Sequence, residues 1–91
     1  MRVIESSSRP RLATGSRLQK TNELPDTLVF PEGILRLKGT AAEILSRCDG
    51  QRTFAEIVAE MSAQFYAADA QIEHETEVFL NRLKERGVID Y

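Results

Sequence analysis

The sequence has very few of the residues that build metal sites and covalent cross-links. It contains one cysteine, Cys48, one histidine, His74, and no tryptophan. A single cysteine excludes an intramolecular disulfide and a cysteine-rich metal site, and no second soft ligand lies one helical turn from His74. The sequence also lacks a Ser/His/Asp order, a glycine-rich phosphate loop and a nucleophile elbow. We therefore expect a protein that is not an enzyme and holds no cofactor or metal.

Long apolar runs are also missing. The N-terminal residues form no signal sequence, and no later stretch is long enough to span a membrane, so the simplest expectation is a cytoplasmic protein. A length of 91 residues with 42% hydrophobic content leaves room for one small domain. A core this small is marginal, so a homodimer is a further possibility. The same limit makes an embedded catalytic pocket improbable.

Charge is unevenly spread along the chain, whose net charge is −2. Residues 1–20 carry five basic residues and one acidic residue, 5 − 1 = +4, so the remainder carries −6. Residues 1–14 are rich in serine and arginine and are interrupted by Pro10, which predicts a flexible basic arm. Two interpretations of this arm remain open: a solvated tail, or a segment that docks on an acidic partner or on a second copy. The folded domain is expected over 15–91.

Short β segments are predicted in the first half of this domain, at 17–20, 27–30 and 34–38. Residues 27–30 are β-branched and aromatic, as strands favour. A tight turn at 31–33 follows, in which Pro31 fixes φ and Gly33 allows positive φ. In the strand 34–38, Leu35 and Leu37 share one face by period-two alternation. The pattern predicts a hairpin over 27–38.

Three helices are predicted after the hairpin. The spacings Thr40-x-x-Glu43 and Thr53-x-x-Glu56 are both typical of a capping box, which predicts helix starts at these threonines. Asp49-Gly50 is expected to stop the first helix, Asp69 to cap the third and Gly87 to end it. The apolar stripe of the first helix includes Cys48, which is expected to be a buried, inert thiol. The stripe of the second contains Phe54, Ile57, Val58, Met61 and Phe65.

The expected fold class is therefore α+β: a small winged-helix-like domain with a short three-stranded antiparallel β-sheet followed by three α-helices. A winged helix raises the alternative of a small DNA-binding regulator, in which the third helix would enter the major groove. Residues 69–86, however, carry three basic and five acidic residues, 3 − 5 = −2. Because phosphate contacts dominate DNA affinity, this sign argues against nucleic acid as a partner.

Peptide binding is the remaining hypothesis. If the strand 34–38 lies at the edge of the sheet, its backbone groups can pair with an added peptide strand, and the third helix would wall the groove. The alternative is that the apolar stripe of this helix is used entirely by the core. The predicted peptide-binding residues on the strand and on the helix are Ile34, Leu35, Arg36, Leu37, Lys38, Ile72, Thr76, Phe79, Leu80 and Leu83.

The sequence also resembles a known family over nearly all of residues 10–91. It is similar to the PqqD family of pyrroloquinoline quinone (PQQ) biosynthesis and to the wider group of RiPP recognition elements, which bind the leaders of ribosomally made, modified peptides. The segments that carry the resemblance are Pro10-x-Leu12-x-x-Gly15-x-Arg17-Leu18, Phe30-Pro-Glu-Gly33, Leu37-x-x-Thr40-Ala41, Ile44-Leu45, Asp49-Gly50-x-Arg52-Thr53, Glu56-Ile57-Val58 and Phe79-Leu80-x-x-Leu83.

The resemblance implies a non-catalytic chaperone or adaptor. Proteins of this family bind the precursor peptide PqqA and present it to the radical SAM enzyme PqqE, which cross-links a Glu and a Tyr of that peptide. The leader of such a peptide adds beside the third strand of the sheet and against the third helix, which matches the ten residues named above. Arg36 and Lys38 would then either pair with acidic leader residues or remain solvated. Iron–sulfur clusters and SAM would belong to the enzyme partner. A subunit that only scaffolds an enzyme is a further alternative.

Overall fold

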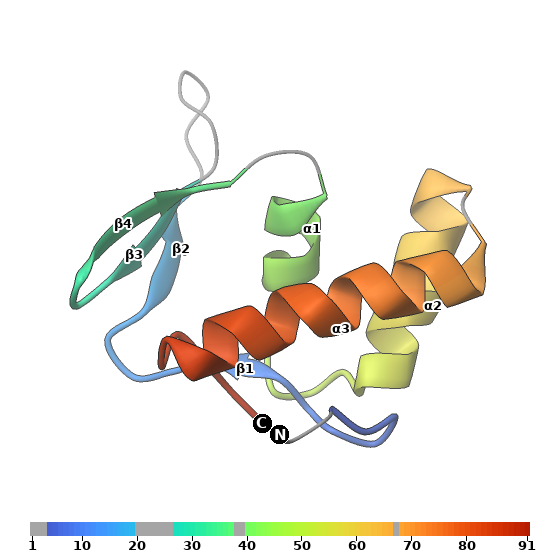
Figure 1. Ribbon diagram of the computed structural model, residues 1–91, viewed down its shortest axis with the longest axis horizontal. Coiled ribbons are helices and arrows are strands. Elements are labelled where there is room, and N and C mark those ends of the chain that lie inside the picture. The colour runs from blue at the N-terminus through green and yellow to red at the C-terminus, as the bar shows by residue number, and fades with distance from the viewer. Residues whose placement is uncertain (1–3, 20–26, 38–39, 67) are drawn as a thin grey trace.

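The computed structural model describes residues 4–19, 27–37, 40–66 and 68–91. A three-stranded antiparallel sheet lies at one end of the molecule, and the helices lie beside it (Figure 1). The elements follow the order β1 (Arg11–Leu12), β2 (Arg17–Gln19), β3 (Thr27–Phe30), β4 (Gly33–Arg36), α1 (Ala41–Ser46), α2 (Phe54–Phe65), α3 (Asp69–Glu85) and β5 (Ile89–Asp90). Over the described part of the chain, the predicted α+β class with a three-stranded antiparallel sheet and three helices is confirmed.

The sheet has the strand order β2-β3-β4, with both pairs antiparallel. Leu28 of β3 is opposite Leu18 of β2 and Leu35 of β4, so these three leucines share one face of the sheet. Leu28 is fully buried, and the other two pack against the core. Their face is therefore the one that covers the hydrophobic core.

The hairpin of β3 and β4 closes at Phe30 and Gly33, which are paired across the two-residue turn at 31–32. Gly33 has φ +155°, so the expected positive φ is present, although this glycine is already the first residue of β4. The strand 27–30 was predicted to the residue. The strand predicted over 34–38 is shorter, because β4 ends at Arg36.

Helix α2 begins with the predicted capping box. The Thr53 hydroxyl accepts from the Glu56 N–H at 3.2 Å, and the Glu56 carboxylate accepts from the Thr53 N–H at 2.9 Å. This arrangement satisfies two backbone donors at the helix start and holds the pKa of Glu56 below its usual value, chiefly through the bond from the Thr53 backbone. Phe65, predicted for the buried stripe of α2, is instead exposed at the end of the helix.

The capping box predicted for α1 is wrong. Thr40 itself has helical dihedral angles, φ −80° and ψ −9°, and its side chain makes no cap hydrogen bond. The Glu43 carboxylate instead accepts from the Arg47 guanidinium at 3.0 Å. Two other predicted helix limits also shift, because α1 ends at Ser46, before the glycine stop, and Ala68 rather than Asp69 is the N-cap of α3.

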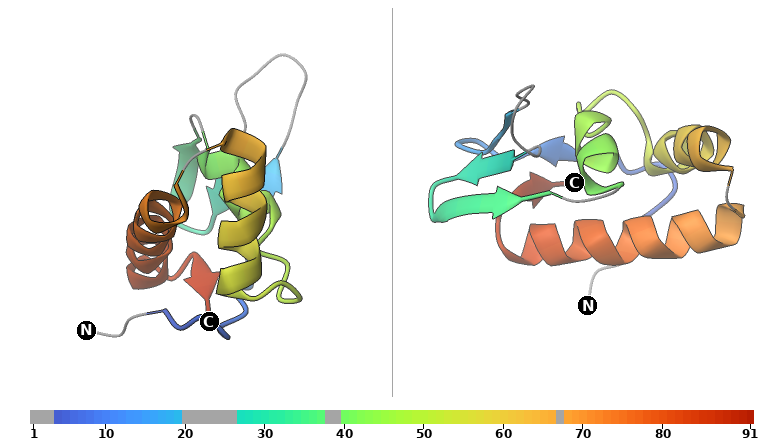
Figure 2. Two further views of the ribbon diagram at one scale, coloured as in Figure 1. Left: turned by 90° about the vertical axis from the view of Figure 1, so that its right-hand side faces the viewer. Right: turned by 90° about the horizontal axis from the view of Figure 1, so that it is seen from above.

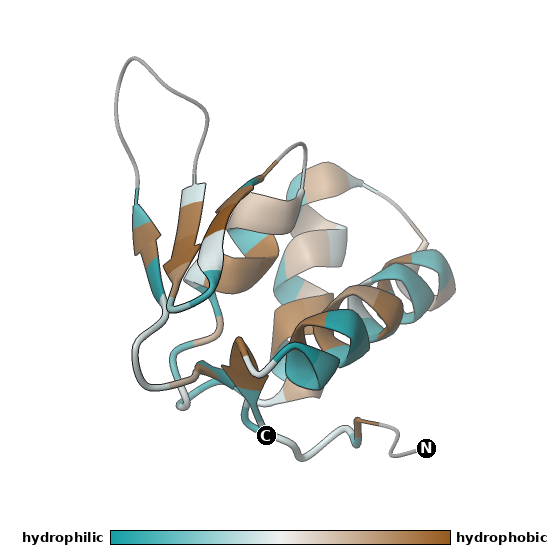
Figure 3. Cartoon of the chain, turned by 60° about the vertical axis from the view of Figure 1, so that its left-hand side comes forward, coloured by the Kyte–Doolittle hydropathy of each residue, from teal (hydrophilic) through white to brown (hydrophobic). Residues whose placement is uncertain are grey.

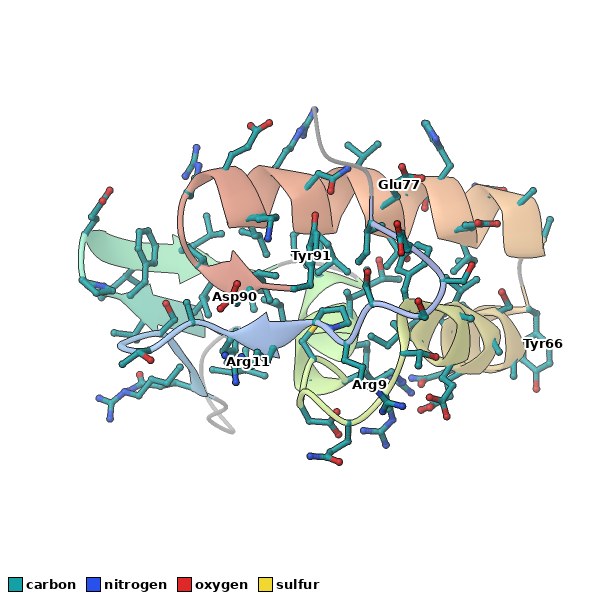
Figure 4. All side chains as sticks on the ribbon, turned by 90° about the horizontal axis from the view of Figure 1, so that it is seen from below. Arg9, Arg11, Tyr66, Glu77, Asp90 and Tyr91 are labelled. Carbon is teal, nitrogen blue, oxygen red and sulfur yellow. The ribbon has the colours of Figure 1, made fainter. Side chains whose placement is uncertain are left out.

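The N-terminal segment differs from the expected flexible arm. Residues 4–14 run along the domain, Ile4 is buried in the core and β1 pairs with β5 (Figures 1 and 4). The carbonyls of Ser8 and Ser6 accept from the first N–H groups of α2, those of Phe54 at 2.7 Å and Ala55 at 3.1 Å. These donors have no partner inside the helix, so the segment completes the start of α2. We accordingly place the beginning of the folded domain near residue 4.

The Asp-Gly-x-Arg-Thr segment before α2 has a structural role. The Asp49 carboxylate accepts from the N–H groups of Gln51 at 2.9 Å and Arg52 at 3.0 Å, which lowers its pKa, with the bond from Arg52 as the larger cause. The Arg52 guanidinium in turn bridges Asp49 and Glu60 of α2. The segment thereby fixes the direction in which α2 leaves the loop.

Candidate peptide-binding site

The outer edge of β4 is open to an added strand. β4 pairs with β3 on one side, and no other strand in the described ranges pairs with it on the other. The pair that closes a two-residue hairpin is a hydrogen-bonded one, so Phe30 and Gly33 form such a pair. Backbone direction alternates along a strand, so Ile34 and Arg36 direct their N–H and C=O groups away from β3. These two residues supply four backbone groups for strand addition.

A hollow of about 400 Å³ lies between this strand and α3. The strand and the C-terminal half of α3 run alongside one another in the view from above (Figure 2). We call this hollow the β4–α3 groove, and its lining residues are Leu35, Phe79, Arg82, Leu83, Glu85 and Arg86. Leu35 reaches it from the core face of the sheet, so a strand added to β4 would direct alternate side chains toward α3.

The five predicted strand residues have different environments. Ile34 is 69% exposed and Arg36 is exposed, whereas Leu35 is half-buried at the groove. Leu37 follows the end of β4 and is buried in the core, so its side chain does not face the edge. Lys38 lies outside the described residues. The geometry thus concentrates the candidate site on residues 34–36.

The five predicted helix residues divide between the core and the groove. Ile72, Thr76 and Leu80 are buried and do not line the groove. These three side chains therefore pack in the core, as the alternative hypothesis for this helix expects. Leu83 is buried but contributes to the groove floor, and Phe79 is half-buried at the groove wall. Only Phe79 and Leu83 therefore come together with Leu35.

Three groove residues were not predicted from the sequence: Arg82, Glu85 and Arg86. A signal for two of them was present, since positions 79, 82, 83 and 86 have the i, i+3, i+4 and i+7 spacing of one helical face. Hydrophilic and apolar residues alternate along the visible side of α3 (Figure 3). Apolar periodicity alone does not identify the arginines that border this face.

The charge at the groove is opposite in sign to that of the whole chain. Among the lining residues, Arg82 and Arg86 outweigh Glu85, 2 − 1 = +1, in a chain of net charge −2. The N-terminal half of α3 instead exposes Glu73 and Glu75. A DNA-reading helix needs positive charge at its N-terminal turns, so this distribution favours a peptide at the groove over a duplex.

Other reactive residues are not assembled into a site. The described residues contain no group of three or more His, Cys, Asp or Glu side chains that would hold a metal ion. Cys48 is buried, its thiol donates to the Ile44 carbonyl at 3.3 Å, and burial raises its pKa to about 12. His74 is exposed on α3. No helix within the described ranges is long and apolar enough to cross a membrane.

Comparison with known proteins gives one consistent family. The family model for coenzyme PQQ synthesis protein D (PqqD) matches residues 27–89. A PqqA binding protein of Azotobacter vinelandii is 37% identical over 89% of this chain and 88% of its own length. A PqqA binding protein of Xanthomonas axonopodis pv. citri is 33% identical over 98% of both chains.

A solved structure agrees with these relatives. The solution NMR structure of the PqqD truncation of Methylobacterium extorquens PqqCD, a stand-alone RiPP recognition element, superposes with a TM-score of 0.81 at 27% identity. The match covers 97% of this chain and 95% of that one. The agreement therefore includes the sheet edge and α3, the two elements that form the groove.

Proposed function

The chain belongs to the PqqD family, and on that premise we propose that it is a peptide-binding adaptor of PQQ biosynthesis that binds the precursor peptide PqqA. The names of its relatives and its likeness to a RiPP recognition element support this function. The structural observation that carries it is the open outer edge of β4 beside the β4–α3 groove. In this account PqqA adds as a strand to residues 34–36.

The pairing would use the four outward backbone groups of Ile34 and Arg36. Backbone pairing supplies affinity that depends little on the peptide sequence, whereas alternate side chains placed in a groove supply selectivity. The side chains of Leu35 and Phe79 form the apolar walls of that groove. Ile34, 69% exposed on the other face of the sheet, would be covered by the opposite side chains of the peptide.

The adaptor acts in the cytoplasm without catalysing a reaction and presents bound PqqA to the radical SAM enzyme PqqE. The family supports this role. Redox groups and SAM are then supplied by the enzyme. The adaptor contributes by holding the peptide extended, which reduces the number of conformations in which it meets the enzyme.

Titration of fluorescently labelled synthetic PqqA tests the proposal. We expect saturable binding in the micromolar range and a further change in anisotropy when PqqE is added. Duplex DNA of arbitrary sequence serves as the competing ligand. Salt-sensitive binding of the duplex, together with no saturable binding of PqqA, would overturn the adaptor function and support the DNA-binding alternative.

A further inference from the structure

A second hollow adjoins the β4–α3 groove on the outer side of α3. It measures about 310 Å³ and is lined by His74, Glu75, Val78, Phe79 and Arg82. Phe79 and Arg82 therefore belong to both hollows and form the ridge between them. We call this second hollow the outer α3 hollow. A peptide that leaves the sheet edge toward it must cross this ridge.

The arginines near the groove form no ion pair, a property that they share with Arg9 and Arg17 in the described part of the chain. Arg47 and Arg52 form ion pairs with Glu60, and Arg11 pairs with Asp90 at 3.6 Å on the neighbouring strand (Figure 4). In the ranges that the structure describes, no carboxylate lies within ion-pair distance of the guanidinium groups of Arg36, Arg82 or Arg86. Arg82 and Arg86 line the groove and are available to a ligand there, whereas Arg36 lies on the other face of the sheet.

Of the three arginines, only Arg82 lines both the β4–α3 groove and the outer α3 hollow. Its neighbours in the groove are the apolar side chains of Phe79 and Leu83, and its neighbours in the outer α3 hollow include Val78. Arg82 is exposed, and Glu85 and Glu75 also line the two hollows, so its selectivity comes from its position beside the apolar walls and not from burial. A carboxylate bound there would lie directly beside the apolar walls of the groove.

We infer that Arg82 is a specificity-determining residue that selects peptides in which a carboxylate is placed two residues from an apolar side chain. In an added strand, residues i and i+2 point to the same face. The apolar side chain occupies the groove between Leu35 and Phe79, and the neighbouring Asp or Glu on that face pairs with Arg82. This inference rests on the proposed function, since it requires the peptide at the β4 edge.

Binding of synthetic PqqA and of variants in which each Asp or Glu is replaced singly by its amide tests this inference. Arg82→Gln is expected to weaken binding of the parent peptide by about two- to fivefold, the scale of one exposed ion pair. One of the amide peptides should bind the unchanged protein more weakly than the parent peptide does, by a similar factor. The same amide replacement should cause almost no further loss of affinity for Arg82→Gln. Arg82→Lys should restore part of the affinity, and raised salt should weaken the unchanged protein more than Arg82→Gln.

The matched control is Arg17→Gln, because Arg17 is an exposed arginine on β2, at the other side of the sheet. We expect the affinity of this control to equal that of the unchanged protein. Saturable PqqA binding with no loss in Arg82→Gln, or with equal losses for every amide peptide, would overturn the role of Arg82 and leave the adaptor function standing. No saturable binding of PqqA to the unchanged protein would overturn both.

Discussion

Leu35 of β4 and Phe79 of α3 line the same groove from opposite sides, one from the sheet and one from the helix. Both are half-buried, so each contributes to the core and still leaves surface for a ligand. This pairing joins the two elements that the peptide-binding account requires. It also distinguishes groove residues from core residues on one helix, since Leu80, next to Phe79 in sequence, is fully buried.

Phe79→Ala should therefore mainly weaken binding, whereas Leu80→Ala should mainly lower stability. Phe79→Ala is expected to weaken PqqA binding by about tenfold, since it removes an apolar wall of the groove. Leu80→Ala should lower the free energy of unfolding by about 2–5 kcal/mol through the cavity that it leaves, with little change in the affinity of the folded fraction. Isothermal titration calorimetry and urea unfolding measure the two quantities. If folded Leu80→Ala lost more affinity than Phe79→Ala, the result would contradict the assignment of Phe79 to the binding surface.

The two Thr-x-x-Glu segments give a matched test of capping. Thr53→Ala removes an observed cap and should lower the free energy of unfolding by about 1 kcal/mol. Thr40→Ala removes no cap hydrogen bond and should change it by less than about 0.5 kcal/mol. The midpoints of urea unfolding provide the comparison, with Thr40→Ala as the control. Equal losses in the two variants would contradict the difference in capping between Thr53 and Thr40.

Stability should fall in acid because two carboxyl groups have a lowered pKa in the folded state. Hydrogen bonds from the Arg52 and Thr53 backbones lower the pKa of Asp49 and Glu56 below their ordinary values of 3.8 and 4.5. The unfolded state then binds more protons, so stability is fully present above the ordinary values and is lost as pH falls through the folded values. Urea unfolding from neutral pH to pH 3 measures this dependence.

Asp49→Asn and Glu56→Gln remove the ionisation but keep a side-chain oxygen that accepts a hydrogen bond. Each variant should therefore show a shallower loss of stability in acid than the unchanged protein. A curve that runs parallel to that of the unchanged protein would contradict the assigned cause for that residue.

Cys48 gives a readout of global unfolding. The thiol is buried and its pKa is raised to about 12, so almost no thiolate is present at neutral pH. A thiol-specific chromogenic disulfide should react with the native protein at the rate of unfolding and rapidly in urea. Rapid reaction in native buffer would contradict the buried position, and Cys48→Ala is the blank.

The sequence predicted the elements better than their ends. The helical stripes and the hairpin follow from periodicity and turn chemistry, which are local properties. The two Thr-x-x-Glu segments are identical in pattern, yet Thr53 has the extended ψ of 163° that a cap needs and Thr40 does not. That difference depends on how the chain enters each helix. The contact of residues 4–14 with the start of α2 likewise depends on tertiary packing.

The candidate site was predictable only where it depends on local sequence patterns. The order of strands in the hairpin places β4 at an edge, and the stripe of α3 places Phe79 and Leu83 on the correct face. Periodicity does not show which members of a stripe the core consumes, and this explains why Ile72, Thr76 and Leu80 do not line the groove. The position of Arg82 between the two hollows depends on the tertiary structure, which periodicity does not show.

The most direct test of the central claim compares PqqA binding by Arg36→Pro and Arg36→Ala. Both variants remove the charge, but only proline removes the outward N–H of Arg36, and prolines are tolerated at sheet edges. Circular dichroism should show that both remain folded. The account predicts that Arg36→Pro binds PqqA at least about tenfold more weakly than Arg36→Ala. Equal affinities in two folded variants would contradict strand addition at β4.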